Sequence, residues 1–148
     1  MALIDLITEN VIKVPMEART KPDVMREMVQ VLKDAGKVEE VEPVVDSLME
    51  RERKGSTGLE MGIAVPHCKT PLVDGLVLAI GIAPQGIDFD SLDGEPSKLF
   101  FVLLAPPDQS GPHIEALSEI ARLTQSSAFY RSLAEARTSK EVVELFTD

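Results

Sequence analysis

The sequence predicts an α/β fold in which one domain holds a mixed β-sheet sandwiched between α-helices. Segments with helical spacing of apolar residues alternate with short apolar runs along the 148 residues, as in sheets that helices cover on both faces. Two of these runs, 76–82 and 99–104, contain no polar alternation, so both faces of each strand should be buried. We expect residues 1–148 to form a single domain, because a chain of this length fills one core.

The first part of the chain should form a strand and two helices. A short strand is expected at 11–14. Thr20 and Asp23 have the spacing of a helix N-cap, and the helix that follows should end at Gly36. A second helix is expected to start at Pro43, because proline suits a first helical turn.

A third helix should follow the strand at 99–104. Ser110 is placed to cap it, which makes His113 its third residue. The residues expected on its buried side are Ile114, Leu117, Ile120, Ala121 and Leu123. Two short helices should end the chain, one capped by Ser127 and one by Thr138.

A glycine-rich turn is the most informative local feature. Gly55, Gly58 and Gly62 bracket Ser56 and Thr57. Glycine permits positive φ angles, so this turn can direct backbone N–H groups toward an anion. Together with the two hydroxyl groups, these donors predict a site for negative charge.

A histidine follows the turn after one short strand. Residues 63–65 are apolar, and Pro66 has no N–H to donate, so strand pairing should stop there and leave His67 at the end of the sheet, facing a cleft. Arg51 precedes the turn and should lie at the mouth of this site. An ordinary surface ion pair of Arg51 with a neighbouring glutamate is the alternative.

The order of these motifs resembles the enzyme IIA domains of the fructose and mannitol class of the bacterial phosphotransferase system, closest to the nitrogen-regulatory branch. The stretches that carry the likeness are R-E, G-S-T-G and G-I-A-V-P-H within 51–67, G-I-D-F-D-S-L-D-G-E-P at 86–96, L-F-F-V-L-L-A-P at 99–106 and H-I-E-A-L-S-E-I-A-R-L from 113. The resemblance implies a mixed sheet between helices. It also implies that His67 is phosphorylated on Nε2 and that Arg51 and His113 are the other catalytic residues.

For such a phosphocarrier, Ser56, Thr57 and Gly58 are the candidate supports for the phosphoryl oxygens. The resemblance implies that the donor is the carrier protein HPr or its nitrogen-branch counterpart, and that the acceptor is a IIB cysteine or a regulatory target. It implies no cofactor and no metal. No G-x-x-x-x-G-K-[ST] nucleotide loop is present, because Gly62 is followed by isoleucine and alanine.

Three functions stay open within this family. The stretch A-P-P-D-Q-S at 105–110 looks like the nitrogen-regulatory branch and favours a regulator. The alternatives are a IIA subunit for fructose or mannitol uptake and a binding module that no longer accepts phosphate. The last is suggested by Glu60, a negative charge beside an anion site; Met61 and Cys68 also depart from the residues usual in the family.

Two other chemistries compete for the same residues. His67, Cys68 and His113 with a carboxylate could form a zinc site, but they lack the paired short spacing of such sites. Cys68 could act as a nucleophile with His113 as its base, but no third residue is placed to orient that base.

Charge and cysteine content narrow the partners and the compartment. The net charge of −10 disfavours nucleic acid and anionic membranes. A single cysteine fits a reducing cytoplasm. The N-terminal residues lack the pattern of a signal peptide, and the apolar runs are too short to cross a bilayer, so we expect a cytoplasmic location and no membrane insertion.

Overall fold

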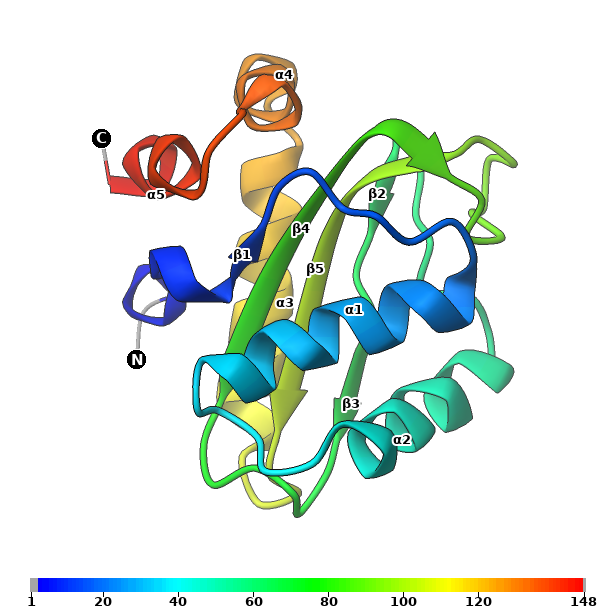
Figure 1. Ribbon diagram of the computed structural model, residues 1–148, viewed down its shortest axis with the longest axis vertical. Coiled ribbons are helices and arrows are strands. Elements are labelled where there is room, and N and C mark those ends of the chain that lie inside the picture. The colour runs from blue at the N-terminus through cyan, green and yellow to red at the C-terminus, as the bar shows by residue number, and fades with distance from the viewer. Residues whose placement is uncertain (1–2, 148) are drawn as a thin grey trace.

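A five-stranded mixed β-sheet forms the centre of the computed structural model, which describes residues 3–147 (Figure 1). The strand order is β1-β4-β5-β2, and β3 also pairs with β5. Only the β4–β5 pair is antiparallel among these described strands. The bounds are β1 Ile12–Lys13, β2 Ile63–Ala64, β3 His67–Lys69, β4 Val77–Ile87 and β5 Ser97–Ala105. The predicted mixed sheet is confirmed; the expected domain bounds 1–148 include residues 1, 2 and 148, which lie outside the described residues.

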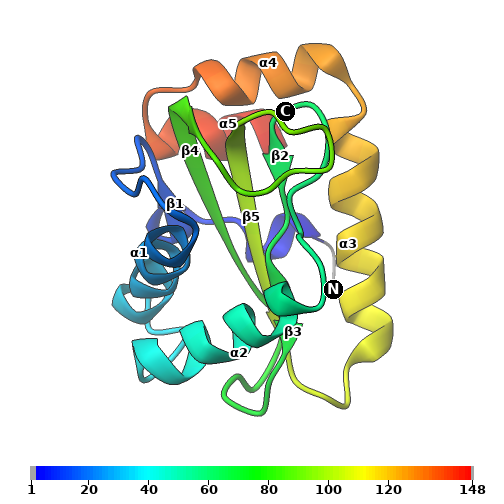
Figure 2. The same cartoon turned by 90° about the vertical axis from the view of Figure 1, so that its right-hand side faces the viewer.

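Helices cover both faces of the sheet (Figures 1 and 2). α1 and α2 lie side by side on one face, and α3 and α4 pack on the other, against β5 and β4. α5 packs against β1 and the short helix before it. The bounds are η1 Leu3–Leu6, η2 Glu9–Val11, α1 Lys21–Asp34, α2 Val41–Arg53, α3 Ser110–Thr124, α4 Ser127–Glu135 and α5 Ser139–Thr147. Within residues 3–147, no helix combines the length and the apolar character needed to cross a membrane.

The two predicted non-alternating strands form the middle of the core. β4 and β5 are longer than predicted, and both faces of β5 are buried from Leu99 to Ala105. Helices on both sides exclude water from them, so a run without polar alternation is stable there. The N-caps at Thr20 and Thr138 are also confirmed, because each hydroxyl accepts the N–H three residues ahead, at 3.3 Å and 3.1 Å.

Two predicted boundaries near the start of the chain were wrong. The strand expected at 11–14 is only Ile12–Lys13, because those two residues are the ones that pair with β4. α2 begins at Val41 rather than at Pro43. Proline is tolerated throughout a first helical turn, where N–H groups have no partner within the helix, so it marks that turn rather than its first residue.

The prediction that strand pairing stops at Pro66 was also wrong. β2 and β3 pair with β5 in one continuous register, with Ile63 opposite Leu99 and His67 opposite Leu103. Pro66 has no N–H, but its carbonyl accepts the N–H of Leu103 at 3.0 Å, so the ladder continues past it. His67 therefore lies within the sheet, not beyond its end.

The buried side predicted for the third helix is only partly confirmed. His113, its fourth residue, and Ala116 are buried, whereas Ile114 is 62% exposed. Of the predicted buried set, Ile120 is buried and Leu117 and Leu123 are partly buried against the core, whereas Ile114 and Ala121 are exposed. The observed orientation places His113 inward, against His67 of β3.

Two predicted caps are shifted by one residue. α3 starts at Ser110 itself, so Gln109 is its N-cap and provides no side-chain hydrogen bond. The cap of α4 is Ser126 rather than Ser127, because the Ser126 hydroxyl accepts the N–H of Phe129 at 3.2 Å. In both cases the N-cap is the residue directly before the one predicted.

Candidate functional site

The imidazole of His67 is held by one backbone contact. His67 opens β3, which lies between α2 and α3 (Figure 2), and its side chain is half-buried. Nδ1 lies 2.7 Å from the carbonyl oxygen of Val65. A carbonyl can only accept, so this contact assigns the proton to Nδ1 and leaves the lone pair on Nε2. His67 therefore presents an unprotonated Nε2.

His113 lies beside His67, as the resemblance implied. The two ring centroids are 5.6 Å apart, with 63° between the ring planes. His113 is 4% exposed, and its Nε2 has no hydrogen-bond partner within the described part of the chain. Burial, and then the charges of His67 and Lys69, lower the pKa of His113. A buried neutral ring with an unpartnered nitrogen can gain a hydrogen bond when an anion enters the site.

Arg51 projects from the last turn of α2 toward the glycine turn. Its Nη1 donates to the carbonyl oxygen of Gly55 at 2.9 Å. The alternative prediction of an ion pair with a neighbouring glutamate was wrong: Glu50 pairs with Arg53, and Glu52 is buried and accepts the N–H of Thr57. The guanidinium keeps further N–H groups for an anion.

The turn residues predicted to support a phosphoryl group have their donors engaged. Ser56 donates its hydroxyl to the Phe89 carbonyl at 2.9 Å and accepts the Gly58 N–H at 3.0 Å. Thr57 donates both its N–H, at 2.9 Å, and its hydroxyl to Glu52. A Cβ on Gly58 would lie 2.9 Å from the Phe89 carbonyl oxygen. These residues hold the turn in shape, and their direct contact with phosphate stays a prediction.

Positive φ angles occur in the turn, but not at all three glycines. Gly55 and Gly62 have φ of 152° and 78°, whereas Gly58 does not have a positive φ and is required by close packing instead. Met61 adopts φ 62°, a conformation that costs energy for a residue with a Cβ.

A cavity of about 190 Å³ lies between Arg51, the turn and His67, and His113 does not line it. Its polar side is formed by Arg51, Ser56, Thr57 and His67, and its apolar side comes largely from α3. The complete lining is Arg51, Ser56, Thr57, Leu59, Val65, His67, Leu117, Ile120, Ala121 and Thr124. Leu117, Ile120 and Ala121 of this wall belong to the side of the helix predicted as buried, but the sequence did not show that this side faces His67. Glu60 is exposed and does not line the cavity.

Two contributors to the site were missed by sequence reasoning, the Val65 carbonyl and the buried Glu52, whereas Lys69 is one of the basic residues that flank the site in the sequence. The Val65 carbonyl is a backbone group with no signature of its own. Glu52 was visible as the second letter of R-E, but nothing in the pattern showed that it is buried. Lys69 donates to the Ser110 hydroxyl at 2.7 Å, which brings a cation to the start of α3. A helix start favours a nearby anion, and this lysine adds to that effect.

The competing chemistries find little support in the structure. Burial raises the pKa of the Cys68 thiol to about 12, so the thiolate that a nucleophile requires is scarce. No group of three or more histidine, cysteine, aspartate or glutamate side chains is arranged for a metal within residues 3–147.

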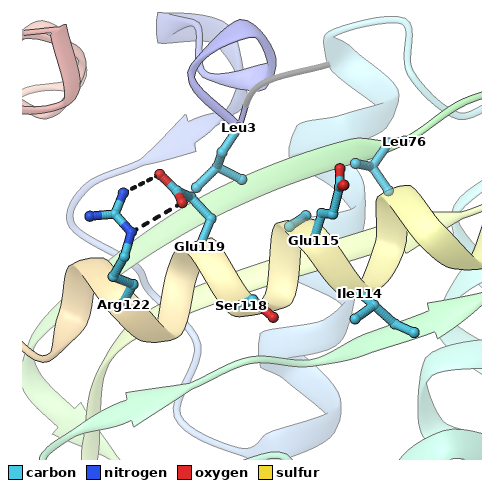
Figure 3. A pocket seen from close by; sticks show the side chains of 8 residues that line it. Leu3, Leu76, Ile114, Glu115, Ser118, Glu119 and Arg122 are labelled. Carbon is cyan, nitrogen blue, oxygen red and sulfur yellow. Dashed lines mark hydrogen bonds and ion pairs between the residues drawn. The ribbon is translucent and has the colours of Figure 1, made fainter.

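A larger hollow of about 470 Å³ lies along the outer side of α3 (Figure 3). Glu115, Glu119 and Arg122 project there beside Leu3 and Leu76, and Arg122 is paired with Glu119. The lining contains neither histidine nor cysteine and shares no residue with the cavity beside His67. It is therefore not the site of histidine chemistry.

Comparison with known proteins identifies the family of the chain. The family "Phosphoenolpyruvate-dependent sugar phosphotransferase system, EIIA 2" matches residues 5–148. A fructose-specific EIIABC component of Bacillus subtilis (strain 168) is 34% identical over 145 residues, which are 98% of this chain and 23% of that protein. The chain thus spans about a quarter of the length of that relative. A nitrogen regulatory protein of Escherichia coli (strain K12) is 36% identical over 108 residues, covering 71% of this chain and 65% of that protein.

The fold is also similar to a solved structure. The crystal structure of nitrogen regulatory protein IIA-Ntr from Neisseria meningitidis superposes with a TM-score of 0.88 at 29% sequence identity, covering 97% of both chains. The mixed sheet with helices on both faces is therefore shared over nearly the whole chain.

Proposed function

Because the chain belongs to the EIIA type 2 family of the phosphoenolpyruvate-dependent sugar phosphotransferase system, we propose that it is a histidine phosphocarrier that accepts a phosphoryl group on Nε2 of His67. The observation that carries the proposal is the 2.7 Å contact from Nδ1 of His67 to the Val65 carbonyl. It leaves Nε2 free to attack phosphorus while Nδ1 stays protonated.

The proposed transfer requires no cofactor. The lone pair of Nε2 forms a bond to the phosphorus of a phosphohistidine on the donor, HPr or its nitrogen-branch counterpart. The donor's nitrogen–phosphorus bond breaks, and its electron pair stays on the donor nitrogen. In the onward step the acceptor atom, the cysteine sulfur in the case of a IIB domain, forms a bond to phosphorus while the bond from Nε2 of His67 breaks and its electron pair returns to Nε2.

Arg51 and His113 are the proposed stabilisers of the transferred group. The guanidinium of Arg51 lines the same cavity as His67 and can donate to two phosphoryl oxygens at once. The unpartnered Nε2 of His113 lies in the ring packed against His67, where it can bind a third oxygen. Charge that spreads over the oxygens during transfer is best stabilised by such donors already in place.

We favour the nitrogen-regulatory role among the functions of this family. The A-P-P-D-Q-S stretch at 105–110 supports it. The alternative is sugar uptake through a IIB domain, which the 34% identity to a fructose-specific EIIABC component over 98% of this chain favours. The acceptor is a regulatory protein in the first case and a IIB domain in the second.

The deciding experiment is incubation of the protein with phosphoenolpyruvate, enzyme I and HPr, followed by mapping of the acid-labile phosphate. We expect one phosphorylated site, on Nε2 of His67, and no label in His67→Ala. A protein that stays unlabelled with every upstream carrier present would instead be the binding module without transfer. Onward transfer to a sugar-specific IIB domain would move the assignment from regulation to uptake.

A further inference from the structure

A buried carboxylate near the site has no role in the chemistry described above. Glu52, in the last turn of α2, is 8% exposed. Both of its oxygens lie 2.9 Å from the N–H nitrogen of Thr57, and the Thr57 hydroxyl also donates to the carboxylate. Nζ of Lys21, at the start of α1, lies 3.5 Å from Oε2 of Glu52. A charge is stable inside a protein only with such partners, so this cluster is built to hold Glu52 in one position.

The hydrogen bonds continue from Glu52, residue by residue, to the proposed phosphoryl acceptor. The carbonyl of Thr57 accepts the N–H of Val65 at 3.0 Å. The carbonyl of Val65 in turn accepts the Nδ1 proton of His67 at 2.7 Å. Every donor in this series points toward Glu52, so the position of Thr57 is linked through Val65 to the acceptor of the Nδ1 proton.

We propose that Glu52 is a positioning residue for His67: it fixes Thr57, and through Thr57 the Val65 carbonyl that keeps the proton on Nδ1 and Nε2 free. The inference rests on the proposed function in that His67 is the phosphoryl acceptor. Glu52 itself does not touch the phosphoryl group. Glu52 instead raises the fraction of molecules in which the His67 imidazole has its proton on Nδ1 and Nε2 directed at the phosphoryl group.

The carboxylate is suited to this position by its two acceptor oxygens. Thr57 presents two donors, and Lys21 presents a third. Glutamine has the same shape but only one acceptor oxygen, and its NH₂ group would face donors. Glu52→Gln therefore tests the contact with the least change of volume.

Glu50 provides a matched control. It lies two residues earlier in the same helix, and its partner is Arg53 at the surface. Glu50→Gln removes the same charge without touching the series of hydrogen bonds that leads to His67.

The first measurement is the tautomer of His67 by ¹⁵N NMR of the unphosphorylated protein, at a pH where the ring is neutral. We expect the Nδ1–H form to dominate in the wild type and in Glu50→Gln. In Glu52→Gln, we expect a mixture with the Nε2–H form. This readout needs no phosphoryl donor, so it decides the inference even if the wild type proves unable to accept phosphate.

The second measurement is the rate of transfer from phosphorylated HPr. A misplaced nucleophile loses rate by about 10- to 100-fold, so we expect kcat of Glu52→Gln to fall by that factor with little change in KM. A folded Glu52→Gln that keeps both the wild-type tautomer and the wild-type kcat would overturn the inference.

A second variant covers the case in which Glu52→Gln does not fold. Thr57→Val keeps the N–H donor and removes the hydroxyl, so we expect a smaller shift of the tautomer and of kcat in the same direction. Thr57→Ser restores the hydroxyl and should restore both. If Thr57→Val behaves as the wild type in both measurements, Glu52 does not position His67.

Discussion

At the scale of single residues, the site depends on protons held in particular places. The carbonyl of Val65 decides which nitrogen of His67 is free. The environment of His113 decides that its ring is neutral before phosphate arrives, since burial lowers its pKa. Both histidines can be found in the sequence. The tautomer of His67 and the neutral state of His113 cannot, because each depends on atoms that the fold brings together.

The neutral state of His113 predicts a pH-dependent stability. The pKa of His113 in the folded protein is below its ordinary value of 6.5, so below that pH the unfolded chain binds more protons than the folded one. The stabilising contribution is complete above pH 6.5 and is lost as the pH falls toward the folded pKa. We expect the free energy of unfolding in urea to drop less between about pH 7.5 and about pH 5.5 in His113→Asn than in the wild type. Equal drops would contradict this assignment.

The buried thiol of Cys68 predicts low reactivity. With its pKa raised to about 12, the thiolate fraction at neutral pH is about 1,000-fold below that of an ordinary cysteine. Iodoacetamide should therefore label Cys68 in the native protein far more slowly than in the unfolded chain. Cys68→Ser should accept phosphate from HPr as the wild type does; a loss of transfer in that variant would revive the thiol as a nucleophile.

At the scale of elements, the turn at 55–62 joins α2, the sheet and the loop after β4. Its shape depends on contacts that no local pattern reveals, such as the Ser56 hydroxyl on the Phe89 carbonyl. The same turn carries Met61 at a positive φ and the exposed Glu60. It is therefore held by its neighbours more than by its own conformational preferences.

The close packing at Gly58 predicts a large effect of one methyl group. A Cβ there would lie 2.9 Å from the backbone oxygen of Phe89 and 3.0 Å from Cα of Ser91. Backbone cannot move aside as a side-chain end can, so we expect Gly58→Ala to lower the free energy of unfolding by about 1–3 kcal/mol. Transfer to His67 should fall with it, because the turn lines the cavity.

Gly75→Ala is the matched control for that variant. Nothing lies within 4 Å of a Cβ built on Gly75, and its φ is not positive. Urea unfolding of both variants compares the same chemical change at a crowded and an open position. Similar stability of the two would show that the turn relaxes away from the loop at 89–91.

At the scale of the whole molecule, the sheet and its two helical layers place the site between elements distant in sequence. Arg51 comes from α2 on one face of the sheet, and His113 comes from α3 on the other face. His67 comes from β3, within the sheet (Figure 2). The whole chain carries a net charge of −10. Folding thus concentrates negative charge on a smaller surface than the unfolded chain presents.

This self-repulsion predicts that salt stabilises the fold. Raising the ionic strength from about 0.01 M to about 0.15 M shortens the screening length from about 30 Å to about 8 Å, which weakens repulsion among surface carboxylates. We expect Tm to rise over that range in NaCl and in KCl alike. Reversing two exposed charges, Glu39→Lys and Asp74→Lys, lowers the net negative charge and should flatten the rise. A Tm that falls with salt would show that attractive surface pairs outweigh the repulsion.

The sequence by itself determined the fold class, the alternation of helices and strands, the buried character of β4 and β5, and the three side chains predicted to carry the chemistry. Apolar periodicity, glycine and proline are read locally, and the ordered motifs around Arg51, His67 and His113 are specific. The tertiary structure alone decided the continuation of the sheet past Pro66, the inward turn of His113 and the burial of Glu52. Each of these depends on a partner far along the chain: the N–H of Leu103, the ring of His67 and the start of α1. Local patterns carry no information about such partners, so only the packed structure could settle them.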